Sequence, residues 1–165
     1  MKRFSLAVIF IIILIGFGYT AKNRWKGEDG YYWQGTINSD GLGYYAYLPC
    51  IFIYHSLDYR ISIKEAQKIH AGTWGPFIYF QNKLINKCFP GVALLLAPFF
   101  LIAYWLSHIM GYNTGGYEFP FQASVSIAAL FYLAVGLIFI RKLLKEFQVS
   151  EFVISLTLIL LVLGT

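Results

Sequence analysis

Long apolar stretches alternate with short polar segments along this chain. The first, from Phe4 to Thr20, carries no charged residue and directly follows Lys2 and Arg3. At about 1.5 Å per residue it would form a helix of roughly 25 Å, close to the roughly 30 Å hydrocarbon core of a bilayer. Residues 4–20 are therefore predicted to form the first transmembrane helix, and the basic flank predicts a cytoplasmic N-terminus.

A second uncharged stretch, residues 121–140, is predicted to form the second transmembrane helix. It stops at a basic group that contains Arg141, Lys142 and Lys145. Basic flanks are retained on the cytoplasmic side, so this group and the basic start of the chain are expected on the same side. An even number of crossings must then separate them, and the two predicted helices supply two.

Two further apolar stretches lie between these helices. Residues 44–57 are interrupted by Pro49 and are too short to cross a bilayer. Residues 90–108 are long enough, although Pro98 would kink a helix there. Because the number of crossings must stay even, either both stretches cross or neither does. Residues 44–57 are too short to cross, so we expect neither to cross. Both are predicted to be interfacial helices within one large outer loop, residues 21–120.

The polar part of that outer loop contains two local signals. Ser62 followed by Glu65 is a capping-box pattern, which predicts a helix from Ser62 to Ile69. Residues 73–80 are rich in glycine and aromatic side chains around Pro76, which predicts extended or turn structure. Neither signal implies any chemistry.

The last apolar stretch, residues 152–165, has about 14 residues and would form a helix of about 21 Å, too short to reach the far interface. It is predicted to be an incomplete third transmembrane helix. We therefore expect the chain to be the N-terminal portion of a longer protein, inactive by itself. The predicted fold class is all-α: a multi-pass integral membrane protein with a large outer loop that carries juxtamembrane helices.

Composition supports this class. Hydrophobic residues make up 58% of the 165 residues and charged residues only 13%, and the mean hydropathy is +0.61. A soluble domain of this size could not bury so much apolar surface. The net charge of +5 comes from short basic groups beside apolar segments. Such groups set topology and contact membrane lipids, so the predicted location is the plasma (inner) membrane and no nucleic-acid partner is expected.

The cysteines and histidines give no metal or redox motif. Cys50 and Cys88 are the only cysteines, and their spacing matches neither a zinc site nor a redox pair. A disulfide between them and two free thiols both stay open. His55, His70 and His108 are far apart in the sequence, so they predict no metal site.

Asp40 is the residue most in need of an explanation. It stands within a stretch rich in glycine and tyrosine, residues 38–49, at the start of an apolar run. One interpretation is a helix N-cap, with Gly41 and Gly43 allowing a sharp turn before the helix. The other is functional, since a carboxylate at a membrane interface can act as a general base or bind a metal. The two interpretations are compatible.

Two short motifs resemble those of a known enzyme class. Residues 40–47, Asp-Gly-Leu-Gly-Tyr-Tyr-Ala-Tyr, are similar to an Asp-x-x-x-Tyr-Ala motif of GT-C type membrane glycosyltransferases. Residues 86–91, Asn-Lys-Cys-Phe-Pro-Gly, are similar to the Lys-Pro element before an interfacial helix in the same class. The layout of a first helix, a large outer loop and juxtamembrane helices also resembles this class. The closer resemblance is to the branch of protein O-mannosyltransferases and the aminoarabinose transferase of lipid A.

The resemblance implies transfer of a sugar from a polyprenyl-phosphate-linked donor to a lipid, glycan or protein acceptor at the outer face of the membrane. Asp40 would be the catalytic base and Lys87 would bind the donor phosphate. Tyr44 and Tyr45 would line a substrate groove, although aromatic residues also occur at membrane interfaces for packing alone. Many members carry a second acidic residue where Gly41 stands here, so the sequence does not support a divalent metal cofactor.

A different class of function fits the same pattern. In a non-catalytic membrane protein, such as a transporter or an assembly subunit, Asp40 would only cap a helix. Lys87 would then be an ordinary basic flank of an apolar helix, with its ammonium at the head-group level. The two hypotheses differ in what Asp40 does, so that residue distinguishes them.

Overall fold

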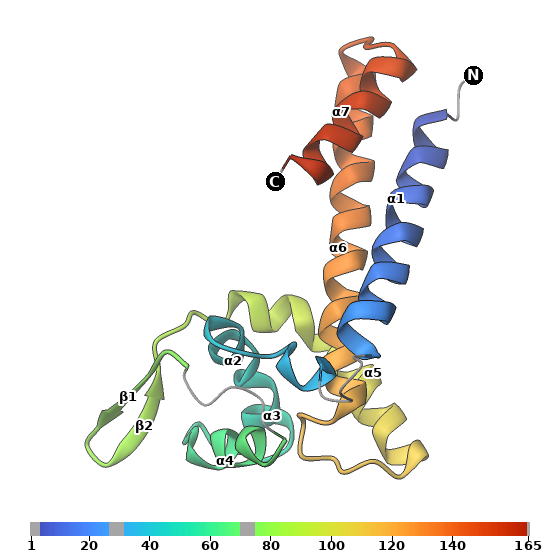
Figure 1. Cartoon of the computed structure of the whole chain (residues 1–165). Helices are drawn as coiled ribbons and strands as arrows, with labels where there is room; N and C mark the ends of the chain where they lie inside the picture. The colour runs from blue at the N-terminus through green and yellow to red at the C-terminus, as the bar shows by residue number, and fades with distance from the viewer. Residues whose placement is uncertain (1–3, 27–31, 70–74, 165) are drawn as a thin grey trace. The chain divides into compact units, whose positions relative to one another are not determined.

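The structure is a computed structural model that describes residues 4–26, 32–69 and 75–164. It is mostly helical (Figure 1). The seven α-helices of this described part are α1 (Phe4–Thr20), α2 (Asp40–Tyr45), α3 (Tyr47–Phe52), α4 (Arg60–Lys68), α5 (Gly91–Met110), α6 (Phe119–Glu146) and α7 (Glu151–Leu163). The remaining elements are the π-helical turn η1 (Ala21–Trp25), the 3-10 turn η2 (Tyr32–Gly35) and the strands β1 (Phe77–Phe80) and β2 (Lys83–Asn86).

Three of these helices are long and apolar enough to cross a membrane, which indicates an integral membrane protein. They cover residues 4–25, 91–110 and 119–146, with mean hydropathies of 2.4, 2.0 and 2.4. The helices predicted over residues 4–20 and 121–140 are thus confirmed as long apolar helices. The stretch predicted as an interfacial helix, residues 90–108, is α5, which also has the length of a span.

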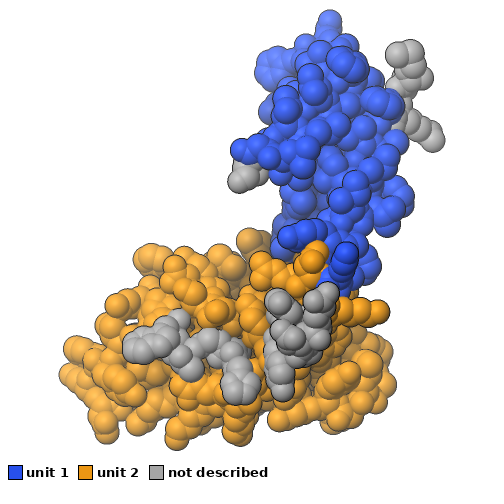
Figure 2. Space-filling view, viewed as in Figure 1, with its two compact units in different colours: residues 1–22, 129–165 blue, residues 23–128 orange. Residues whose placement is uncertain are grey.

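The chain forms two compact units, which Figure 2 shows in separate colours: unit 1 comprises residues 1–22 and 129–165, and unit 2 comprises residues 23–128. In unit 1, α1 and the second part of α6 run antiparallel. Ile9 of α1 shares a buried cluster with Leu137 of α6. Further along, a Cβ on Gly16 would lie 3.1 Å from the Leu130 side chain. Ile154 and Leu158 of α7 complete the cluster.

Polar contacts join the start of α1 to the end of α6. The Arg141 Nε donates a hydrogen bond to Ser5 Oγ at 2.6 Å, and Glu151 Oε2 accepts from the Ser5 backbone N–H at 3.1 Å. Lys145 Nζ lies 2.6 Å from Glu151 Oε1. The start of α1 and the end of α6 therefore lie together in unit 1; on which side of the membrane they lie stays a prediction.

In unit 2, α2 to α5 and the start of α6 surround a core rich in aromatic residues. Its buried members include Ile37, Leu42, Tyr45, Phe100, Tyr117 and Phe121. The apolar stretch predicted as one helix over residues 44–57 is instead two short helices, α2 and α3, which begin at Asp40 and end at Phe52. Pro49 lies in the first turn of α3, where a missing N–H costs nothing because that position has no intrahelical acceptor.

The expectation of an all-α fold is wrong at one place. Strands β1 and β2 form an antiparallel hairpin in which Phe77 pairs with Asn86 and Phe80 pairs with Lys83. Gln81 and Asn82 form its two-residue turn with φ angles of 45° and 61°. Positive φ at both turn residues matches the right-handed twist of the flanking strands. The expectation of extended or turn structure over residues 73–80 holds for β1, while residues 70–74 lie outside the described residues.

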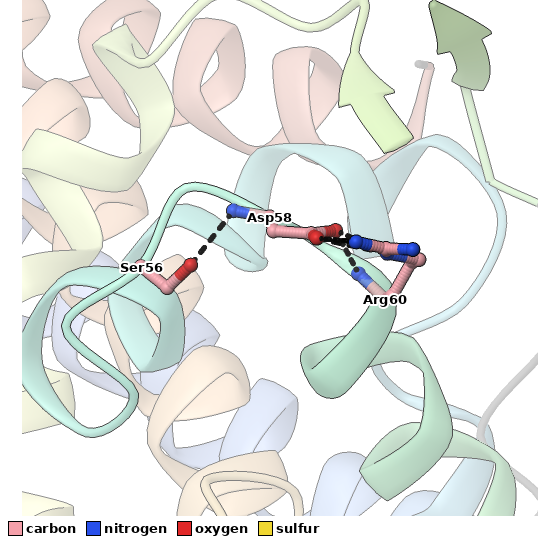
Figure 3. A network of polar contacts seen from close by, with 3 residues as sticks. All are labelled: Ser56, Asp58 and Arg60. Carbon is pink, nitrogen blue, oxygen red and sulfur yellow. Dashed lines mark hydrogen bonds and ion pairs between the residues drawn. The ribbon is translucent and has the colours of Figure 1, made fainter. Parts of the chain in front are cut away.

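Helix α4 begins earlier than the capping-box pattern predicted. Its first residue is Arg60, whose backbone N–H and Nε donate to Asp58 Oδ1 at 3.2 and 2.9 Å. Figure 3 shows Asp58 held between Arg60 and Ser56, whose Oγ accepts from the Asp58 backbone N–H at 3.1 Å. Ser62 therefore lies inside the helix, and its buried hydroxyl is hydrogen bonded to that of Tyr117.

Candidate functional site

Asp40 is the first residue of α2 and not its N-cap. Ser39 holds the N-cap position with φ of 50° and makes no side-chain cap. An acidic residue in the first turn still favours the helix through the helix dipole. The Asp40 side chain is exposed, and in the part of the chain that the structure describes no hydrogen bond or ion pair engages its carboxylate.

Helix α2 packs tightly against the segment that precedes α5. A Cβ on Gly43 would lie 2.4 Å from Pro76 Cγ and 2.7 Å from Cys88 Sγ, so only glycine fits without a shift. Asn86 Nδ2 donates to the Gly43 carbonyl at 2.6 Å. These contacts bring together the two motifs that sequence analysis singled out, residues 40–47 and 86–91.

Cys88 lies next to Asp40. Its thiol donates to the Asp40 carbonyl oxygen at 3.9 Å. Burial raises the pKa of the Cys88 thiol, the negative charge of Asp40 raises that pKa further, and a side-chain hydrogen bond with Tyr44 opposes the rise. Asp40, Tyr44 and Cys88 therefore form one cluster on α2 and the neighbouring segment. The sequence left open whether Cys50 and Cys88 form a disulfide. In the structure they do not: both are free thiols, and Cys50 is buried.

Lys87 is held beside this cluster by its backbone. Its N–H donates to the Pro76 carbonyl at 2.8 Å, and Asn86 Oδ1 accepts from the Cys88 N–H at 3.0 Å. The Lys87 side chain is exposed, and within the described ranges it has no ion-pair partner. A carboxylate, a phenol and an ammonium thus extend from two segments that touch.

Tyr45 does not share this exposed surface. It is buried, its hydroxyl donates to the Gly116 carbonyl at 2.5 Å, and its ring packs edge-on against Phe100 and Tyr117. Burial raises the pKa of the Tyr45 phenol well above its ordinary value. The predicted substrate contact of Tyr45 is therefore corrected to a packing role, in which it anchors α2 to the core of unit 2.

Other tyrosines of this region also bind backbone carbonyls. The Tyr47 hydroxyl donates to the Cys88 carbonyl and the Tyr54 hydroxyl to the Gly115 carbonyl, each at 2.5 Å. Together with Tyr45, they tie α2 and α3 to the chain on both sides of α5. The many tyrosines of residues 44–54 are thus largely explained by structure, and the exposed Tyr44 is the one whose ring faces outward beside Asp40.

Sequence analysis missed Gln122, which fixes where α2 begins. It is fully buried; its Oε1 accepts from the Ile37 N–H at 2.8 Å and its Nε2 donates to the Tyr117 carbonyl at 3.2 Å. The sequence did contain a signal for this role: Gln122 stands within an apolar run, and an amide side chain that is buried there needs hydrogen-bond partners. Its partner at Ile37 lies just before Asp40, so this contact positions the start of α2.

A pair of carboxylates, Glu65 and Glu118, lies outside this cluster. Burial raises the pKa of Glu118, and the negative charge of Glu65 raises it further. Glu65 already pairs with Lys68 at 2.5 Å. Across residues 4–26, 32–69 and 75–164, no group of three or more His, Cys, Asp or Glu side chains is placed to hold a metal ion.

Comparison with known proteins assigns no family to this arrangement. No protein-family model matches the chain, and neither does any curated protein or solved structure.

Proposed function

We propose that this chain carries the acceptor-activating part of a membrane glycosyltransferase, which moves a sugar from a polyprenyl-phosphate-linked donor to an acceptor at the outer face of the membrane. The observation that carries the proposal is the contact between residues 40–47 and 86–91, in which Asn86 binds Gly43 and Cys88 lies against Asp40. Two motifs distant in sequence thereby present an exposed carboxylate and an exposed ammonium from adjoining segments.

The chemistry needs one base and one group that stabilises the leaving phosphate. Asp40 accepts the proton of the acceptor hydroxyl, and the oxygen of that hydroxyl forms the new bond to the anomeric carbon of the sugar. The bond from that carbon to the phosphate oxygen breaks, and polyprenyl phosphate leaves with the bonding electrons. Lys87 meets the resulting negative charge with a charge-assisted hydrogen bond. The Tyr44 hydroxyl, beside Asp40, orients the acceptor.

The position of Lys87 along the chain suits a phosphate that belongs to a lipid. α5 begins shortly after it, and residues such as Leu94 and Leu95 on that helix are exposed and apolar. A lysine at the start of such a helix lies at the level where lipid head groups carry their phosphates. The donor would therefore reach Lys87 from within the bilayer, while the acceptor hydroxyl reaches Asp40 from the aqueous side.

The alternative is a non-catalytic membrane protein, such as a transporter or an assembly subunit. One observation favours it: Asp40 lies in the first turn of α2, where an acid stabilises a helix with no chemistry at all. Under this alternative, removing the negative charge of Asp40 weakens α2 slightly and affects no sugar transfer. The same substitution therefore tests both hypotheses.

The test is Asp40→Asn, introduced into the gene at its native locus. Membranes from the variant are supplied with polyprenyl-phosphate mannose and polyprenyl-phosphate aminoarabinose, each radiolabelled in the sugar, and transfer to membrane acceptors is measured. Loss of a general base lowers the rate by about 100-fold or more, so we expect transfer to fall by that factor while the amount of protein in the membrane stays the same.

Asp58→Asn is the matched control, because Asp58 is a carboxylate of the same unit that pairs with Arg60 (Figure 3). That variant is expected to keep the wild-type rate of transfer. Wild-type transfer by Asp40→Asn contradicts the catalytic assignment and favours the non-catalytic alternative. Membranes that transfer sugar from neither donor contradict the proposed function itself.

A further inference from the structure

One face of the β1–β2 hairpin is partly covered by the rest of unit 2, and the other face is uncovered. Cross-strand partners point to the same side of a hairpin and neighbours along a strand point to opposite sides. Phe77, Tyr79, Leu84 and Asn86 share one face, on which Leu84 is buried against Ala46 and Tyr59 while Tyr79, near the turn, is exposed. The opposite face, which we call the outer face, consists of Ile78, Phe80, Lys83 and Ile85.

The outer face is apolar and exposed. Ile78 is 43% exposed, Phe80 56% and Ile85 40%. The apolar surface continues along the chain through Phe89, which is 85% exposed, to Val92 and Leu94 on α5. Figure 1 shows the hairpin extending from the rest of unit 2 as a separate two-stranded arm. A two-stranded hairpin is marginal in water by itself, and the packing of Leu84 and Phe77 against the rest of unit 2 supports only one of its faces.

Charge along this part of the chain has one sign. Between Glu65 and Glu118 the sequence contains no acidic residue, while Lys83 stands on the outer face and Lys87 follows the hairpin. Lysines beside exposed aromatic and aliphatic side chains are typical of segments at the head-group level of a bilayer, where the ring or stem is buried and the ammonium meets lipid phosphate.

We propose that the outer face of the hairpin, together with Phe89, lies in the interfacial layer of a bilayer that contains anionic lipid. Ile78, Phe80 and Ile85 contact the upper acyl chains, and Lys83 binds lipid phosphate. Continuity with the exposed apolar face of α5 identifies the bilayer as the occupant, because both belong to unit 2 of a membrane protein. This contact is independent of sugar transfer, although it would hold the segment that carries Lys87 at the membrane surface.

The experiment measures the depth of a nitroxide label. A cysteine replaces Phe80 in a chain whose native cysteines are substituted, Cys50→Ala and Cys88→Ser, and the labelled protein is reconstituted in vesicles of phosphatidylcholine and phosphatidylglycerol. Collisions of the nitroxide with oxygen, which concentrates in lipid, are compared with collisions with a water-soluble nickel chelate. Lipids labelled at the head group or along the acyl chain calibrate the depth. Ile85→Cys provides a second labelling site in case Phe80→Cys fails to fold.

The label is expected at or below the depth of the head-group standard. Adding Lys83→Glu is expected to shift it toward water in these anionic vesicles, while Lys64→Glu, on the exposed surface of α4, is the matched charge control and leaves the depth unchanged. A label as accessible to the nickel chelate as one in water overturns the proposal. A label immobile and shielded from both reagents also overturns it, because a protein surface then covers the hairpin.

Discussion

Gly43 decides how closely α2 approaches the chain before α5. A glycine inside a helix costs about 1 kcal/mol relative to alanine, so its presence in so short a helix needs a packing reason. The reason is the space that a Cβ would need, which Pro76 Cγ and Cys88 Sγ already occupy at 2.4 and 2.7 Å. The same close approach allows the hydrogen bond from Asn86 to the Gly43 carbonyl.

Gly43→Ala is therefore expected to destabilise the protein although alanine is the better helix former. Overpacking of a filled site costs about 1 to 3 kcal/mol, which outweighs the gain of about 1 kcal/mol in helix propensity. Thermal unfolding in detergent, followed by circular dichroism, measures the effect. The matched control is Gly41→Ala in the same helix, where no atom lies within 4 Å of the new Cβ. A Gly43→Ala variant as stable as Gly41→Ala would show that this contact does not limit the approach.

At the scale of elements, Glu151 holds three helices together. It lies at the start of α7, accepts hydrogen bonds from Ser5 at the start of α1, and forms ion pairs with Arg141 and Lys145 at the end of α6. Hydrogen bonds from Lys145 and Ser5 lower the pKa of Glu151 to about 2. Its negative charge is therefore part of the folded arrangement of unit 1.

This lowered pKa predicts how stability depends on pH. A carboxylate whose pKa falls on folding stabilises the folded state above its unfolded pKa, and the contribution is lost as pH falls through the folded value. Glu151→Gln is thus expected to lower the unfolding temperature at pH 7. The difference from wild type should shrink as pH falls from about 4.5, the ordinary value, toward about 2.

Unfolding temperatures of the detergent-solubilised protein at several pH values measure this difference. The control is Glu146→Gln, an exposed residue at the end of α6, whose substitution is expected to leave the unfolding temperature nearly unchanged at every pH. A difference between Glu151→Gln and wild type that persists unchanged at pH 2 would contradict the role of the charge.

The elements differ in how far the sequence predicts them. Uncharged runs of 17 residues or more identify α1, α5 and α6, because length and hydropathy are properties of the run itself. The hairpin and the break between α2 and α3 depend on contacts with distant residues, such as Leu84 with Tyr59. The contact of Cys88 with Asp40 likewise joins residues far apart in sequence. Sequence analysis therefore identified Asp40, Tyr44 and Lys87 as candidates, but it could not predict that Tyr45 is buried.

At the scale of the whole molecule, the main question is whether α5 crosses the membrane. The two ends of this helix are tied to the same short piece of chain. Tyr47 binds the carbonyl of Cys88, which precedes α5, and Tyr45 binds the carbonyl of Gly116, which follows it. α5 has 20 residues and is about 30 Å long. If it crossed, the chain from Gly111 would have to return through lipid to reach Tyr45, which exposes backbone to hydrocarbon at high cost.

We therefore predict that Ser39, before α5, and Asn113, after it, lie on the outer side of the membrane. Single cysteines at these positions, in a chain without Cys50 and Cys88, are expected to react with a membrane-impermeant maleimide added to intact cells. A cysteine at Lys142, which follows the predicted second span, is expected to react only after the membrane is permeabilised. Gel-shift detection of the attached reagent reports each position.

The three positions together distinguish the possible topologies. If Ser39→Cys and Asn113→Cys react from outside and Lys142→Cys does not, α5 lies in the interface and the exposed site around Asp40 faces the outer side. Labels on opposite sides at Ser39 and Asn113 would mean that α5 crosses, and the tyrosine hydrogen bonds at its two ends could not form together in the membrane. Labelling of Ser39→Cys only after permeabilisation would place Asp40 in the cytoplasm, where sugar transfer at the outer face is impossible.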